Sequence, residues 1–148
     1  MWSSEIENIL LTSRNFIGCF PMDDLPIFPK RMPASLIVNT DISSRTGDHW
    51  LALVLEEDEC FYFDSFGLPI LDETLINYLK PYYNKVTYSD VCIQHVRSNK
   101  CGEFCILFVK YVNSKSTYEI FLSEFNRINI KENDVIVASL LEGVSYKD

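Results

Sequence analysis

The sequence predicts an α+β fold in a single domain, in which a central buried helix packs on a mixed β-sheet and further helices surround it. Its 148 residues suit one compact domain, and no repeat or linker suggests a second one. The segments 49–55 and 60–64 are apolar at nearly every position, which is typical of strands covered on both faces. The segment 100–113 is apolar nearly all round, which is typical of a helix in the interior.

The first part of the chain predicts one short helix, a long irregular segment and one strand. Ser4, followed three residues later by Glu7, reads as a capping box, so we expect a helix from Ser4 to about Thr12. Four prolines between residues 16 and 33 favour an ordered surface loop with little regular structure. The segment 35–40 is a predicted strand, and the polar segment 41–48 is a predicted loop.

The middle of the chain predicts a hairpin, a helix and a further short strand. The segments 49–55 and 60–64 are the two arms of the hairpin, joined by the acidic turn 56–59. A modest helix is expected over 72–79, because a proline follows it closely. The segment 91–96 is expected to be a short strand.

The last part of the chain predicts three helices. Asn99 is a suitable N-cap for the buried helix Lys100–Asn113. Two more helices are expected near Thr117–Phe125 and Lys131–Glu142. Gly143 is the expected stop of the last one.

Charge and composition argue against several classes of protein. The net charge of −8, from 13 basic and 21 acidic residues, does not favour DNA binding, which needs clustered Lys and Arg. No run of 18 apolar residues predicts a membrane span. The N-terminus lacks the basic start and apolar stretch of a signal peptide, and the cysteine count of five is odd. We therefore expect an intracellular, non-secreted protein with free thiols.

Three residues form a candidate catalytic group. Cys101 lies in the first turn of the predicted helix, where unpaired backbone N–H groups favour negative charge, and a cysteine attacks carbonyls only as the thiolate. An imidazolium at His49 would stabilise that thiolate and later protonate a leaving amine. Asp64 ends the neighbouring hairpin strand, within reach of His49, so its carboxylate could fix the tautomer of the ring.

Two further residues complete the candidate site. The amide of Gln94, together with the backbone N–H of Cys101, could bind the oxyanion that develops during acyl transfer. Gly102 would let a substrate backbone approach closely beside the sulfur. Together these groups are the parts of a Cys–His hydrolase, which needs no metal and no cofactor.

Each residue alone also has a plain structural interpretation. Cys101 could fill the core, His49 could be a surface or structural group, and Asp64 could simply open a turn. A zinc site is a further alternative, although its candidate ligands lack a paired C-x₂-C spacing. Those ligands are Cys92, His95, Cys101 and Cys105.

The segment from Leu36 to Val112 resembles the adenovirus protease (adenain) and its relatives in mobile elements of the Maverick/Polinton type. The resemblance begins at Ile37-Val38-Asn39-Thr40 and continues through blocks that keep their order. These blocks are His49-Trp50, then Phe63-Asp64-Ser65-Phe66-Gly67, then Gln94 followed after six residues by Cys101-Gly102. More distantly, the order His–Asp–Gln–Cys is similar to that of SUMO-specific proteases.

The resemblance implies a papain-like cysteine protease site on a circularly rearranged α+β fold. It implies Cys101 as nucleophile, His49 as base, Asp64 as the orienting carboxylate and Gln94 as oxyanion donor. Trp50 matches the tryptophan that follows the catalytic histidine and packs around the site. The implied substrates are viral precursor proteins of a capsid or core, often cut after small residues such as glycine. The implied location is the host cell, in nucleus or cytoplasm, or the virion.

The chain also departs from the adenovirus pattern. Adenovirus enzymes generally have Glu where this chain has Asp64, and they are basic and activated by DNA and by a disulfide-linked viral peptide. This chain is acidic, and Tyr83 rather than a cysteine stands nearest the position of that disulfide. We therefore expect no activation by DNA, and nothing in the sequence supports an activating peptide. A deubiquitinase or SUMO-type isopeptidase and a non-enzymatic binding module remain alternatives.

Overall fold

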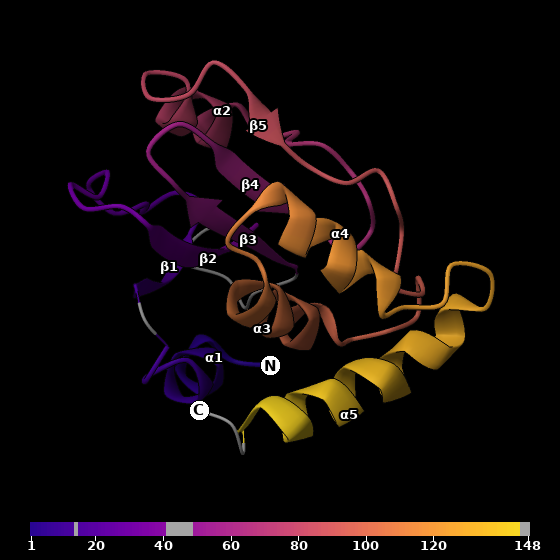
Figure 1. Ribbon diagram of the computed structural model, residues 1–148. Coiled ribbons are helices and arrows are strands. Elements are labelled where there is room, and N and C mark those ends of the chain that lie inside the picture. Colours follow the sequence, from indigo (N-terminus) through magenta and orange to yellow (C-terminus); the bar gives the residue numbers. More distant parts are fainter. Residues whose placement is uncertain (14, 41–48, 146–148) are drawn as a thin grey trace.

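A mixed β-sheet forms the centre of the structure, a computed structural model that describes residues 1–13, 15–40 and 49–145 (Figure 1). Within these residues the sheet has five strands in sequential order. They are β1 (Phe16–Pro21), β2 (Ala34–Asn39), β3 (Trp50–Leu55), β4 (Cys60–Phe63) and β5 (Val86–Thr87). The two outer pairs are parallel and the two inner pairs antiparallel, so the predicted mixed sheet is confirmed. The predicted loop 41–48 lies outside the described residues.

Helices cover both faces of the sheet. They are α1 (Ser3–Ile9), α2 (Glu73–Leu79), α3 (Cys101–Tyr111), α4 (Lys115–Ser123), the 3₁₀ turn η1 (Ile130–Glu132) and α5 (Asn133–Ser145). Figure 1 shows α3 lying against the sheet, with α1, α4 and α5 around it. The helix α2 packs on the opposite face. The predicted central helix is therefore present, and no described helix has the length and apolarity that a membrane span requires.

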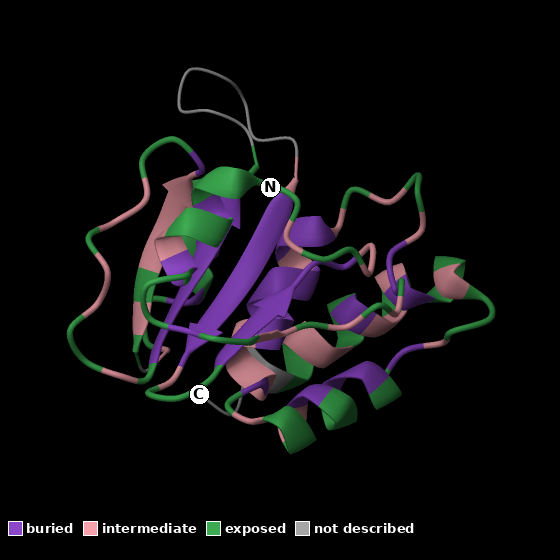
Figure 2. Ribbon diagram, turned by 90° about the horizontal axis from the view of Figure 1, so that it is seen from above, coloured by how far each residue is buried: buried purple, intermediate pink, exposed green. Residues whose placement is uncertain are grey.

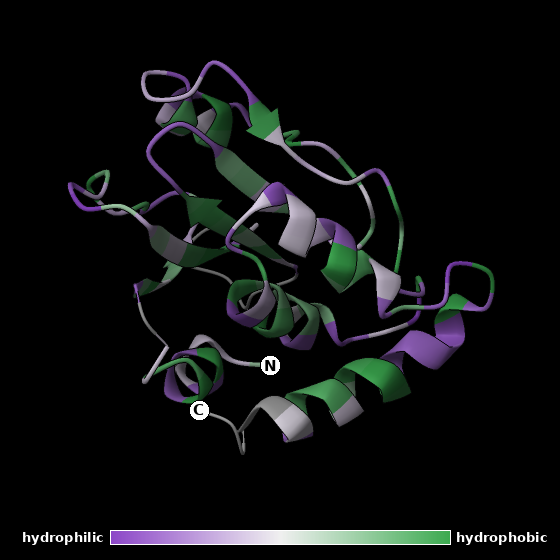
Figure 3. Cartoon of the chain, viewed as in Figure 1, coloured by the Kyte–Doolittle hydropathy of each residue, from purple (hydrophilic) through white to green (hydrophobic). Residues whose placement is uncertain are grey.

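Both faces of the two hairpin strands are buried, and this explains why nearly all of their residues are apolar. Along β3, Trp50, Ala52 and Val54 point into the core shared with α3, while the alternate leucines point to the other face. The segment 22–33 and α2 cover that second face. Figure 2 shows the inner strands as a continuous buried layer. Figure 3 shows that the same strands and α3 consist mainly of hydrophobic residues. The predicted cover on both faces is confirmed.

Aromatic rings join α3 and α4 to the sheet. Phe63 of β4 is fully buried and stacks on Phe108 of α3, with ring centroids 4.9 Å apart and planes 10° apart. Phe121 of α4 meets Phe63 edge-on at 5.3 Å. Phe63 thus fixes α3 against the strand that Asp64 directly follows.

Truncating Phe63 tests how much this aromatic cluster contributes to stability. We expect Phe63→Ala to lower the free energy of unfolding by about 3–5 kcal/mol, because it leaves a cavity where three rings now pack. Urea unfolding followed by circular dichroism measures the change. The control is Ile27→Ala, because Ile27 is 91% exposed and should change stability by less than about 0.5 kcal/mol. Equal midpoints for the two variants would contradict this account of the core.

Two segments differ from their predicted structure. The segment 16–33 is predicted as surface loop with little regular structure, but residues 16–21 form β1. This strand exists because it pairs in parallel with the distant β2, with a register shift next to Gly18, where φ is +136°. The segment 91–96 was expected to be a strand and is not one. Its Ile93 and Gln94 N–H groups both donate to the carbonyl of Ser65, which is a loop contact rather than a sheet ladder.

The predicted helix caps were displaced. The helix α1 begins after Trp2 rather than Ser4, with the Trp2 N–H donating to the Glu5 carboxylate at 3.0 Å, and it ends at Ile9. The N-cap of α3 is Lys100 rather than Asn99.

The C-terminal helices agree with the prediction except at the last stop. The predicted helix near residues 117–125 is α4, which begins slightly earlier because Ser114 accepts the capping hydrogen bond from the Thr117 N–H. The predicted helix 131–142 corresponds to η1 and α5. Gly143 does not end α5, which continues to Ser145.

Candidate active site

His49 and Asp64 meet at one end of the hairpin. The register of β3 and β4 pairs Ala52 with Phe63, so the residues just beyond these positions lie at the same edge of the sheet. His49 Nε2 donates to Asp64 Oδ1 at 2.9 Å. The same carboxylate oxygen accepts the Phe66 N–H at 2.9 Å, which holds it in place. Because Nε2 faces the carboxylate, Nδ1 is the ring nitrogen left for another partner.

The His49 side chain also interacts with Cys101. The cysteine is the first residue of α3, is 9% exposed, and its side chain hydrogen bonds with that of His49. Burial lowers the pKa of His49, but the hydrogen bonds and charges of Asp64 and Cys101 outweigh burial and raise it to about 9. The Phe66 ring stacks on the imidazole, with centroids 4.9 Å apart. With its pKa raised to about 9, the His49 imidazole is charged at neutral pH and interacts with the Cys101 side chain.

The raised pKa of His49 can be tested through Asp64. Asp64→Asn removes the negative charge, so we expect the His49 pKa to fall from about 9. Nuclear magnetic resonance titration of ring protons measures this, and His95, the other histidine of the chain, is an internal reference. Because the folded pKa is raised, the stability that the charged His49 adds is present in full below about pH 6.5. It is lost as the pH rises through about 9. An identical His49 titration in both proteins would contradict the assignment.

Gln94 is almost fully buried, with 1% of its surface exposed. Its Oε1 accepts a hydrogen bond from the Ser65 hydroxyl, and its Nε2 donates to the carbonyl of Ser98 at 3.0 Å. Gly67 lets the turn after Asp64 come close to the segment before Gln94. Its φ is +75°, and a Cβ there would lie 2.7 Å from the Val91 carbonyl carbon. The turn after Asp64 and the segment that carries Gln94 are thus in direct backbone contact.

Trp50 and Gly102 lie together at the start of α3. A Cβ on Gly102 would lie 3.4 Å from Cδ1 of Trp50 and 3.0 Å from the sulfur of Met1, so only glycine leaves these contacts undisturbed. The Trp50 indole N–H donates to the Met1 carbonyl at 3.3 Å. The structure therefore places both predicted supporting residues beside Cys101.

The other thiols differ from Cys101 in their surroundings. Cys105 lies one turn along α3, and burial raises the pKa of its thiol well above the ordinary value. Burial likewise raises the pKa of Cys60 to about 12. The Cys92 thiol donates to the Gln94 carbonyl at 3.2 Å, and His95 Nδ1 accepts the Arg97 N–H. Across the part of the chain that the structure describes, no His, Cys, Asp or Glu cluster could hold a metal ion, the proposed zinc ligands included.

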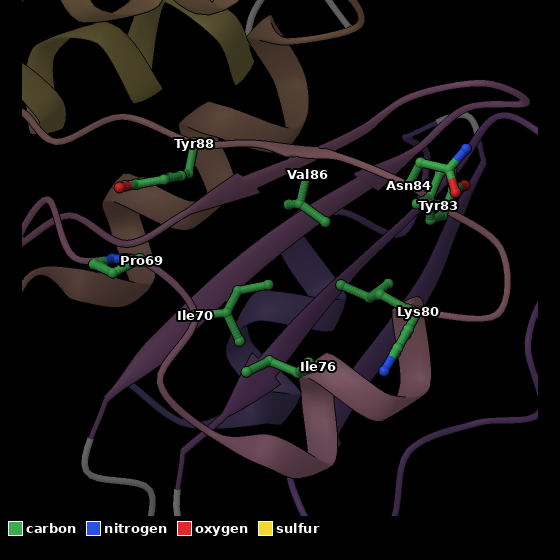
Figure 4. A pocket seen from close by; sticks show the side chains of 9 residues that line it. Pro69, Ile70, Ile76, Lys80, Tyr83, Asn84, Val86 and Tyr88 are labelled. Atoms are coloured by element: carbon green, nitrogen blue, oxygen red, sulfur yellow. The ribbon is translucent and has the colours of Figure 1, made fainter.

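Two hollows lie on the opposite face of the sheet from α3. One has a volume of about 380 Å³ and is lined by His49, Asp64 and apolar side chains of the segment 68–71. The other has a volume of about 310 Å³ and lies between α2 and β5, with Ile70, Ile76 and Val86 pointing into it (Figure 4). The second hollow has none of the predicted site residues in its lining, and we assign no role to it.

Some of the contacts that hold the site were not predicted from the sequence. Ser65 and Phe66 belong to a motif block, but nothing in their spacing indicated a bond to Gln94 or a ring against His49. Asn133 of α5 is fully buried and donates to the Ile93 carbonyl, across 40 positions in the chain. The sequence does not show which polar residues will be buried, so these long-range hydrogen bonds could be identified only in the folded structure.

The comparisons with known proteins decide the family. The family model described as adenovirus endoprotease matches residues 16–142. The chain belongs to this family. The protein named Protease of Avian adenovirus 8 (strain ATCC A-2A) is 31% identical over 147 residues, covering 90% of this chain and 66% of that protein. The chain thus spans slightly less than two thirds of the length of this adenovirus relative.

The fold is also that of a solved protease. The crystal structure of the ASFV pS273R protease superposes with a TM-score of 0.56 at 15% identity, over 88% of this chain and 61% of that chain. The papain-like architecture of adenain type, expected from the resemblance, is therefore confirmed, and so is the resemblance to adenovirus proteases.

Proposed function

We propose that this member of the adenovirus endoprotease family is a cysteine endopeptidase that cleaves precursor proteins of a virus or virus-like element. The observation that carries the proposal is the bonded group Asp64–His49–Cys101 at the N-terminus of α3. A core cysteine or a structural histidine would not require a buried carboxylate, a charged ring and a thiol in one chain of hydrogen bonds.

Cleavage would begin when the Cys101 sulfur, ionised by proton transfer to His49, attacks the carbonyl carbon of the scissile bond. The His49 imidazolium then gives its Nδ1 proton to the leaving amine, and the acyl group stays on sulfur. Water next attacks the thioester while His49 accepts its proton, which releases the acid and restores the ion pair. Asp64 holds the ring by Nε2 throughout, so that Nδ1 always faces the sulfur.

The oxyanion formed in both steps needs donors. Gln94 Nε2 carries two N–H groups, and only one of them is directed at the Ser98 carbonyl. We assign the other, together with the backbone N–H of Cys101, to the oxyanion. The first N–H groups of a helix have no acceptor within the helix, so the Cys101 N–H is available for this role.

The proposed substrates are precursor proteins of a capsid or core, cut after small residues in the host cell or the virion. The net charge of −8 gives no support for DNA as a partner.

Mixing the purified chain with recombinant capsid and core precursors tests this function. Mass spectrometry of new N-termini should show cuts after small residues with the natural chain and none with Cys101→Ala. Ubiquitin and SUMO conjugates form a parallel panel. Cleavage confined to those conjugates would replace the proposed substrate class by an isopeptidase one, and no Cys101-dependent cleavage of either panel would leave only a binding module.

A further inference from the structure

Buried polar side chains concentrate around Gln94. Of the residues that the structure describes, six polar or charged ones are buried, and four of them belong to one connected region. These four are Asp64, Ser65, Gln94 and Asn133. Burying a polar group costs free energy unless it is hydrogen bonded. A cluster of buried polar side chains therefore suggests that their hydrogen bonds hold a particular arrangement.

Ser65 contacts the segment of Gln94 in two ways. Its hydroxyl donates to Gln94 Oε1, and its carbonyl accepts the N–H groups of Ile93 and Gln94 at 2.9 and 3.1 Å. Ser65 is fully buried and directly follows Asp64. One residue therefore links the carboxylate that holds His49 to the amide proposed for the oxyanion.

The other end of the amide is held from α5. Gln94 Nε2 donates to the Ser98 carbonyl, and the Ser98 hydroxyl donates to Asp134 at 2.7 Å. The Lys100 N–H donates to the same hydroxyl at 3.1 Å, just before α3 begins. The Ser98 hydroxyl thus contacts both α5 and the residue just before α3, which fixes the residue whose carbonyl receives the amide N–H.

These contacts decide which way the amide faces. With an O–H directed at Oε1 and a carbonyl directed at Nε2, the opposite orientation would set oxygen against oxygen at the Ser98 end. It would also turn the amide oxygen, which repels negative charge, toward the proposed oxyanion. The Ser98 carbonyl, which can only accept, sets this orientation, and the hydrogen bond from the Ser65 hydroxyl holds the oxygen end of the amide in place.

The geometry points to Ser65 as a positioning residue that acts through Gln94, by holding its amide so that an N–H faces the oxyanion. The inference rests on the proposed function, since it assumes that Gln94 stabilises an oxyanion. Ser65 itself touches no reacting atom. Its removal should therefore affect the rate of acyl transfer more than the binding of substrate.

A double-mutant cycle tests the inference on the full chain, with kcat and KM measured on a cleaved precursor peptide. Ser65→Ala should lower kcat about tenfold with little change in KM, in keeping with the loss of one neutral hydrogen bond. Gln94→Ala should lower kcat about 10²–10³-fold. In the Gln94→Ala background, Ser65→Ala should cost nothing further, because the residue through which it acts is gone.

Two more variants separate positioning from structure. Ser65→Cys keeps a weak donor and should give an intermediate kcat. Ser35→Ala removes another buried serine hydroxyl, on β2, and should leave kcat unchanged. An unchanged kcat in Ser65→Ala, or an equal loss in both backgrounds, overturns the inference while the proposed function stands. Activity in Gln94→Ala equal to that of the natural chain, or no Cys101-dependent cleavage, overturns the inference together with the role assigned to Gln94.

Discussion

Cys101→Ala is expected to abolish peptide cleavage, a loss on the order of a millionfold in kcat. Without the sulfur no acyl-enzyme can form, and His49 has no thiol from which to take a proton. The free energy of unfolding should change by less than about 1 kcal/mol, because only one sulfur atom is removed at the helix terminus. Cleavage assays and urea unfolding on one preparation measure both quantities.

Cys105→Ala is the matched control for this substitution. It removes the same atom one turn along α3, but from a fully buried position packed in the core. We expect it to lower stability more than Cys101→Ala does and to retain cleavage, the reverse pattern. If Cys101→Ala still cleaved in a preparation free of other proteases, the assignment of the nucleophile would be wrong.

His49→Ala is expected to lower kcat almost as much as loss of the sulfur does. Thiol and imidazole act as a unit, so removing either removes both proton transfer and thiolate formation. Because the pKa of His49 is raised to about 9, activity in the natural chain should decline as the pH rises through that value and the imidazolium is lost. The decline should be absent from the residual activity of His49→Ala.

His95→Ala is the control for the imidazole. The His95 ring accepts a local N–H from Arg97, and His95 lies next to Gln94 in the chain. Its loss should leave the rate and the pH profile near those of the natural chain. Comparable losses in the two variants would mean that the ring of His49 has no special place in the reaction.

The strands of the hairpin could be predicted because their own residues carry the signal. Both faces of β3 are buried, so its sequence is apolar at every position, and Asp64 follows as the first charged residue beyond β4. The pairing of His49 with Asp64 then followed from hairpin geometry alone. Local patterns of this kind involve residues close in sequence, so they can be predicted without a structure.

Long-range contacts account for what could not be predicted. The strand β1 depends on pairing with β2 beyond a proline-rich segment, and the strand expected at 91–96 was replaced by contacts with Ser65. The partners of Gln94 come from a turn 29 positions earlier in the chain and from the Ser98 loop tied to α5. A single serine in a turn carries no sequence signal of such a bond, because any exposed turn favours the same residue.

The reactivity of Cys101 relative to Cys92 tests the central account most directly. At pH 6 few ordinary thiols are ionised, so iodoacetamide modifies them slowly. Peptide mass spectrometry of the alkylated chain should show Cys101 reacting faster than Cys92, although Cys92 is exposed and Cys101 is almost buried. In His49→Ala this lead should disappear. A Cys101 that reacts no faster than Cys92, or that keeps its lead without His49, would contradict an ion pair at the start of α3.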